Sequence, residues 1–189
     1  MKCLHQCVLI GSLLPLSWLG MMVVHESGHV VGAWLTGGTV ERIVAHPFTF
    51  SRTDLSQNPR PLLVAWAGPV GGALFPLGAL GLTYLCRVPG RYLLRFFAGF
   101  CLIANGAYIG AGSFLKAGDA GDLLRHGAAM WQLWIFGLAT APLGIYFWHN
   151  QGHHFGLGNA RGKVQPVAAY VVLCVLATLL ALELLLSSD

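Results

Sequence analysis

Apolar residues dominate five long stretches of the chain, and most polar residues lie between them. The stretches cover residues 8–35, 62–85, 92–115, 130–148 and 167–186. Each has close to, or more than, the roughly 20 residues that a helix needs to cross a bilayer. The pattern therefore predicts five transmembrane helices. The first contains Pro15, which favours a kink or a division into two pieces.

The connection over residues 37–60 is the longest polar one and has a pattern typical of β-structure. Residues 39–44, with the sequence TVERIV, alternate imperfectly between polar and apolar side chains, which favours a strand. Phe48, Thr49 and Phe50 are expected to pair back as a second strand. Residues 152–165 are rich in Gly and His and predict a simple loop.

Composition agrees with a membrane protein and excludes a water-soluble globule. Hydrophobic residues make up 56% of the chain and charged residues 10%, whereas a soluble domain has about 25% charged residues. We therefore expect residues 1–189 to form a single integral membrane domain, an all-α polytopic bundle with a short β-prone segment after the first span. The net charge of +4 comes from scattered basic residues, which argues for contacts with lipid headgroups and against nucleic-acid binding.

The first apolar stretch contains His25-Glu26-Ser27-Gly28-His29, an H-E-x-x-H pattern. This spacing places two imidazoles one helical turn apart on one face, where they can bind zinc. Glu26 could then act as general base toward a zinc-activated water. Ionisable groups at membrane depth are expensive and usually functional. The alternative is two packed histidines, one of them paired with Glu26.

A catalytic zinc needs a third protein ligand, and Asp119 is the first candidate. If successive spans alternate in direction, the third span ends on the side of the membrane where the histidine pair lies. Asp119 and Asp122 follow that end and are the one close acidic pair in the chain. Asp122 is the main rival ligand, and His126 and His46 are weaker ones. Asp119 could instead, or in addition, cap a helix over residues 122–126.

Asn105 is a polar residue deep in the predicted third span. We predict that it binds substrate, as a hydrogen-bond partner of the substrate or of the oxyanion. A structural hydrogen bond between helices is the open alternative.

Three segments, in this order, resemble the site-2-protease-like intramembrane zinc metallopeptidases. They are HESGH in an early span, Ala67-Gly68-Pro69 in the next span, and residues 118–124 with the sequence GDAGDLL. The last is similar to the family's L-D-G-G-x-x-L segment and places the family's metal-binding Asp at Asp119. Two features depart from the family pattern. Ala120 stands where the family usually has Gly, and the N-x-x-P segment that often precedes the Asp is missing, since Asn105 is further away and has no matching Pro.

The resemblance implies a minimal family member with a three-helix metallopeptidase core. It implies a zinc metalloendopeptidase that hydrolyses peptide bonds in or near the membrane, with Zn²⁺ held by His25, His29 and Asp119 and with Glu26 as general base. The implied partner is a membrane protein or membrane-adjacent peptide. Such a substrate must unwind locally, and the segment from Thr39 to Phe50 could pair with it as a strand.

Two other functions stay open at this point. One is a catalytically inactive relative that binds or escorts membrane proteins, against which the intact Glu26 argues. The other is a zinc hydrolase of lipid amides or esters. The sequence leaves substrate, membrane orientation and oligomeric state open.

Overall fold

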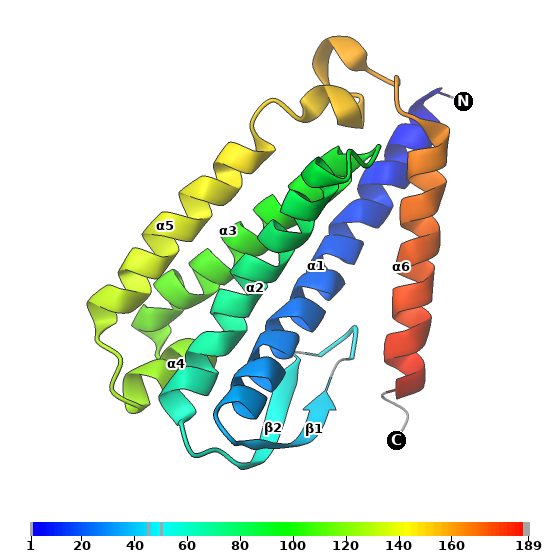
Figure 1. The fold of residues 1–189 in the computed structure, drawn as a ribbon. Coiled ribbons are helices and arrows are strands. Elements are labelled where there is room, and N and C mark those ends of the chain that lie inside the picture. Colours follow the sequence, from blue (N-terminus) through cyan, green and yellow to red (C-terminus); the bar gives the residue numbers. More distant parts are fainter. Residues whose placement is uncertain (1, 45, 50, 187–189) are drawn as a thin grey trace.

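Among the residues that the structure describes, five long helices form a bundle, with a small β-hairpin at one end (Figure 1). The computed structural model describes residues 2–44, 46–49 and 51–186. The elements are α1 (Lys2–Leu35), β1 (Thr39–Val44), β2 (Arg52–Gln57), α2 (Pro61–Leu85), α3 (Arg91–Leu115), α4 (Gly118–Arg125), α5 (Met130–Trp148), the short 3₁₀ helices η1 (Gly152–Phe155) and η2 (Gly158–Ala160), and α6 (Pro166–Leu186).

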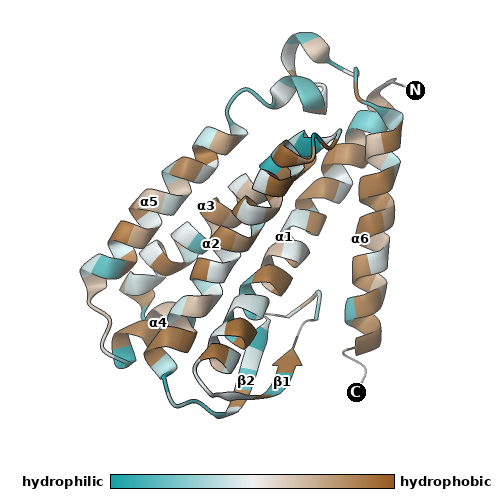
Figure 2. Ribbon diagram, viewed as in Figure 1, coloured by the Kyte–Doolittle hydropathy of each residue, from teal (hydrophilic) through white to brown (hydrophobic). Residues whose placement is uncertain are grey.

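The five long helices α1, α2, α3, α5 and α6 are each long and apolar enough to cross a membrane. Hydrophobic residues cover most of their length, and hydrophilic residues gather toward their ends and in the connections (Figure 2). Many large apolar side chains face outward, among them Leu138, which is 75% exposed. Such a surface requires lipid around it. These features confirm the predicted all-helical, multi-pass membrane fold.

α1 is one uninterrupted helix of 34 residues that continues through Pro15, so the first span is not divided. A proline in a helix interior costs about 3 kcal/mol, which the packing of α1 against both α2 and α6 can offset. At 1.5 Å per residue the helix is about 51 Å long. It must therefore tilt or project beyond the hydrocarbon core, which is about 30 Å thick.

β1 and β2 form an antiparallel hairpin in which Val44 pairs with Arg52 and Thr39 with Gln57. The predicted second strand was therefore placed too early in the chain. Phe48 lies in a turn and Thr49 in a bend, closed by a bond from the Thr49 amide to the His46 carbonyl at 3.1 Å. Phe50 is outside the described residues. The chain needs these positions to reverse direction before pairing can begin.

The long helices follow one another in the order α6, α1, α2, α3 and α5, each in contact with the next. α2 packs against α1 and α3, α5 packs against α3, and α6 packs against α1. α1, α3 and α6 run in one direction, and α2 and α5 return (Figure 1). The end of α1, the hairpin and α4 therefore meet at one end of the bundle.

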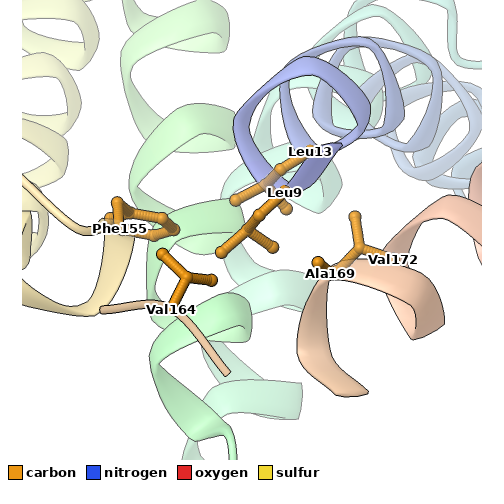
Figure 3. Close-up of a cluster of buried hydrophobic side chains, with 6 residues drawn as sticks. All are labelled: Leu9, Leu13, Phe155, Val164, Ala169 and Val172. Atoms are coloured by element: carbon orange, nitrogen blue, oxygen red, sulfur yellow. The ribbon is translucent and has the colours of Figure 1, made fainter. Parts of the chain in front are cut away.

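α6 is fixed to α1 at the opposite end by a buried apolar cluster. Leu9 and Leu13 of α1 meet Ala169 and Val172 of α6, together with Phe155 and Val164 from the connection before α6 (Figure 3). The prediction of a simple loop over residues 152–165 was wrong, because this connection contains the short helices η1 and η2. These short helices let Phe155 reach the cluster.

Candidate metal centre

His25 and His29 form the core of the site on one face of α1. Their side chains are buried, with residue exposures of 7% and 8%. The Nε2 atoms of the two rings lie 3.1 Å apart. The helical i, i+4 spacing therefore brings two nitrogen donors to one point, as the sequence predicts.

Asp119 reaches these rings from α4, which is 90 or more residues away in sequence. Its Oδ2 lies 2.7 Å from Nε2 of His25 and 3.3 Å from Nε2 of His29. The chain turns sharply before it through Lys116 and Gly118, whose φ angles are 52° and 56°. The Asp119 amide then donates a hydrogen bond to the Tyr108 hydroxyl at 3.1 Å. This turn delivers the carboxylate to the histidine pair.

The alternatives to Asp119 lie elsewhere. Asp122 forms an ion pair with Arg125 at 2.9 Å, and its side chain is 49% exposed. His126 is exposed, and His46 lies in the hairpin turn, where its Nδ1 accepts a bond from the Phe48 amide. Within residues 2–44, 46–49 and 51–186, the one group of three His, Cys, Asp or Glu residues suited to a metal ion is His25, His29 and Asp119.

The expectation of a helix cap at Asp119 was wrong. α4 begins at Gly118, so Asp119 lies in its first turn, and Ala117 is the N-cap residue. Burial alone would raise the pKa of Asp119. The hydrogen bonds and the opposite charge of His25 and His29 outweigh burial and lower the pKa below its usual value. The carboxylate is thus ionised and able to bind a cation at neutral pH.

Hydrogen bonds on the far side of each imidazole fix which nitrogen carries the proton. Nδ1 of His29 lies 2.8 Å from the Val64 carbonyl oxygen, which can only accept, so this nitrogen is the donor. Nδ1 of His25 lies 2.7 Å from Oδ1 of Asn105. The Asn105 amide is oriented by its Nδ2, which donates to the Cys101 carbonyl at 2.9 Å. With its proton on Nδ1, each ring in its neutral form presents an Nε2 lone pair toward Asp119.

The donor set fits a small divalent cation. Two imidazole lone pairs and a carboxylate oxygen converge, and these three acceptors cannot bond one another without a shared proton or a cation. A tetrahedral zinc with bonds of about 2.0–2.1 Å separates its ligand atoms by about 3.3–3.4 Å. The observed separations are 2.7, 3.1 and 3.3 Å, so small side-chain rotations would seat the ion. Two histidines and one carboxylate leave a fourth position for water or substrate, as catalytic zinc sites require.

Asn105 lies beneath the cluster, 1% exposed, with its amide oxygen on His25. This geometry favours the structural alternative over direct substrate binding. We expect Asn105→Leu to weaken zinc binding by about 10–100-fold, the usual cost of losing a partner behind a metal-bound histidine. Asn105→Asp keeps an acceptor for the His25 N–H and should bind zinc more tightly than Asn105→Leu. Zinc titration of both variants measures this. Unchanged zinc affinity with lost cleavage would instead favour the substrate-binding role.

Three glycines of α1 and α2 allow close packing around the histidine pair. A Cβ at Gly28 would collide with the backbone of Ala67, and a Cβ at Gly68 would collide with the imidazole of His29. A Cβ at Gly72 would lie 2.6 Å from Nδ2 of Asn105. The Ala67-Gly68-Pro69 segment and the small residues after it are therefore explained by contact with the site.

Ala120, one of the two departures from the family pattern, is fully buried. It packs in an apolar cluster with Ile109 and Leu123. Gly112 makes room for its methyl group, since a Cβ there would lie 3.2 Å from that of Ala120. The extra methyl group is accommodated without moving Asp119 away from the histidines.

Glu26 points from α1 toward the hairpin. It is 5% exposed, and both its oxygens accept hydrogen bonds, Oε1 from the Ser51 hydroxyl at 2.8 Å and Oε2 from the Thr53 hydroxyl at 2.7 Å. Sequence reasoning missed both hydroxyl residues. The sequence offers one signal for them, namely two hydroxyl side chains at alternate positions near the start of a strand. That pattern is common on surface strands and does not by itself indicate a contact with Glu26.

Tyr108 was also missed by sequence reasoning. It lies about one helical turn after Asn105 on α3. Its ring packs edge-on against His25 with centroids 6.0 Å apart. Its hydroxyl accepts from the Asp119 amide, so its own proton is available to a ligand in the site.

One comparison with known proteins gives a match. The sequence model of the family described as Peptidase M50B-like matches residues 3–109. The matched region contains α1, the hairpin, α2 and most of α3, and so includes His25, Glu26, His29 and Asn105. It ends before Asp119. No curated protein and no solved structure matches the chain significantly.

Proposed function

The chain belongs to the Peptidase M50B-like family, and from this premise we propose that it is an intramembrane zinc metalloprotease that hydrolyses peptide bonds in or near the membrane. The observation that carries the proposal is the convergence of His25, His29 and Asp119 on one point, with Glu26 adjacent in sequence and buried. A purely structural metal site has no need of that carboxylate.

Each residue of the site has its own role in the proposed reaction. His25, His29 and Asp119 would hold the zinc ion. Zinc, when bound, polarises the scissile carbonyl and activates water for attack. Glu26 takes the proton from the attacking water and returns it to the leaving amine. Tyr108 would donate a hydrogen bond to the carbonyl oxygen as negative charge develops there.

The substrate is proposed to be a membrane-protein or membrane-adjacent segment in an extended conformation. A helix satisfies its own amide groups and hides them from attack. The hairpin lies at the end of the bundle that holds the site (Figure 1), and an outer edge of a two-stranded sheet can bind an unwound segment by strand addition.

Metal removal tests the proposal. Purified protein in detergent is expected to contain one zinc ion per chain, measured by mass spectrometry. Treatment with a chelator should abolish cleavage of a transmembrane test peptide, and added zinc should restore it. His29→Ala should lack both zinc and activity.

The same preparation separates the other two functions. Zinc-loaded protein that cleaves lipid amides or esters and no peptide would indicate a lipid hydrolase. Protein that binds no zinc and cleaves neither substrate would indicate an inactive relative.

A further inference from the structure

We propose that Ser51 and Thr53 are positioning residues that hold the carboxylate of Glu26 in its proton-accepting orientation. The inference rests on the proposed function and adds residues outside the zinc-binding motif. Each hydroxyl donates to a different oxygen of Glu26, at 2.8 and 2.7 Å. Two donors on two oxygens fix both the position and the rotation of the carboxylate plane.

The hairpin is suited to supply both donors. Ser51 immediately precedes β2 and Thr53 is its second residue. Side chains two residues apart in an extended segment point to the same side. Both strands of the hairpin contact α1, so one face of this short segment can present two hydroxyls to Glu26 on the side of that helix.

Hydroxyl groups satisfy the buried carboxylate and leave it able to react. A charge 5% exposed is costly to bury without hydrogen bonds. Each carboxylate oxygen has two lone pairs, so one hydroxyl on each leaves a lone pair for the water proton. Among the described residues, no Lys or Arg forms an ion pair with Glu26, so a cation does not occupy the lone pairs that the hydroxyls leave free.

The proposal links the hairpin to catalysis through Glu26. The ligands His25, His29 and Asp119 make no recorded bond to Ser51 or Thr53 within the described residues. Removing the two hydroxyls should therefore disturb proton transfer and leave metal binding intact.

The test compares three variants with wild type in zinc content and in kcat and KM for a transmembrane test peptide. Ser51→Ala/Thr53→Val removes both donors. Ser51→Thr/Thr53→Ser exchanges them and keeps both hydroxyls. Ser56→Ala is the control, because Ser56 lies on the same strand and its hydroxyl donates to the Thr39 carbonyl at 3.4 Å, away from Glu26.

We expect the double removal to lower kcat by about 10–100-fold, the scale of a misplaced reacting group, with KM and zinc content near their wild-type values. The exchange variant should recover most of kcat, and Ser56→Ala should match wild type. Zinc content also reports that each variant is folded.

Two results overturn the proposal while leaving the protease function intact. One is an unchanged kcat in the double-removal variant. The other is a loss of activity that follows zinc loss or KM, or that the exchange variant does not recover. Wild-type protein that binds zinc and cleaves no peptide contradicts the proposed function itself, and the role of Ser51 and Thr53 falls with it.

Discussion

Replacing Glu26 by Gln is expected to lower peptide cleavage by about 10²- to 10⁴-fold, the range that a general base contributes. Gln has nearly the same shape and can still accept a hydrogen bond, but its amide cannot take a proton from water. The neighbouring ligands His25 and His29 keep their positions on α1, so zinc content should be unchanged. Cleavage of a transmembrane test peptide and zinc analysis of the same sample measure both effects.

Glu183→Gln provides the matched control. It makes the same chemical change on α6, which supplies none of the residues of the site, and should leave cleavage at the wild-type level. Full cleavage by Glu26→Gln would remove Glu26 as the base. Loss of zinc from Glu26→Gln would show that this carboxylate supports the metal site instead.

The second large effect is expected from Gly68→Ala, a change of one methyl group on α2. The new Cβ would collide with the imidazole of His29. That ring has little freedom, because Val64 holds its Nδ1 and the partner ligands flank its Nε2. The backbones cannot easily separate, since α1 and α2 are already in contact through Gly28 and Gly71. His29 must therefore leave its position.

We expect Gly68→Ala to weaken zinc binding by about 100-fold or more, above the usual cost of losing a supporting partner, and to lose cleavage in parallel. Gly78→Ala and Gly81→Ala are controls on the same helix, where an added Cβ meets nothing within 4 Å. There the change should be neutral or stabilising, because Ala is favoured over Gly within helices by roughly 0.5–1 kcal/mol. Gly68→Ala with normal zinc affinity would show that the α1–α2 contact can relax.

Asp119 is the site residue that the family match does not reach, because that match ends at residue 109. Its assignment depends on geometry instead. For Asp122 to take the place of Asp119, its ion pair with Arg125 would have to break and α4 would have to rotate. The contacts with His25 and His29 are already formed by Asp119.

The spans and the histidine pair follow from the sequence alone. Hydropathy over about 20 residues is a property of contiguous chain, and so the ends of α2, α3, α5 and α6 fall within one residue of the predicted stretches. The i, i+4 spacing of His25 and His29 likewise requires only a helix. Even the side of the membrane that receives Asp119 follows from counting spans.

The contacts between residues far apart in the sequence follow only from the tertiary structure. The choice between Asp119 and Asp122 depends on the turn at Lys116 and Gly118, and the role of Asn105 depends on which group of α1 it meets 80 residues away. The position of β2 and the bonds from Ser51 and Thr53 to Glu26 depend on strand register against β1 and on contact with α1. Local propensity does not determine these contacts, because each bond forms only after helices and strands have packed. A neighbouring residue of the same type would satisfy the local sequence pattern equally well.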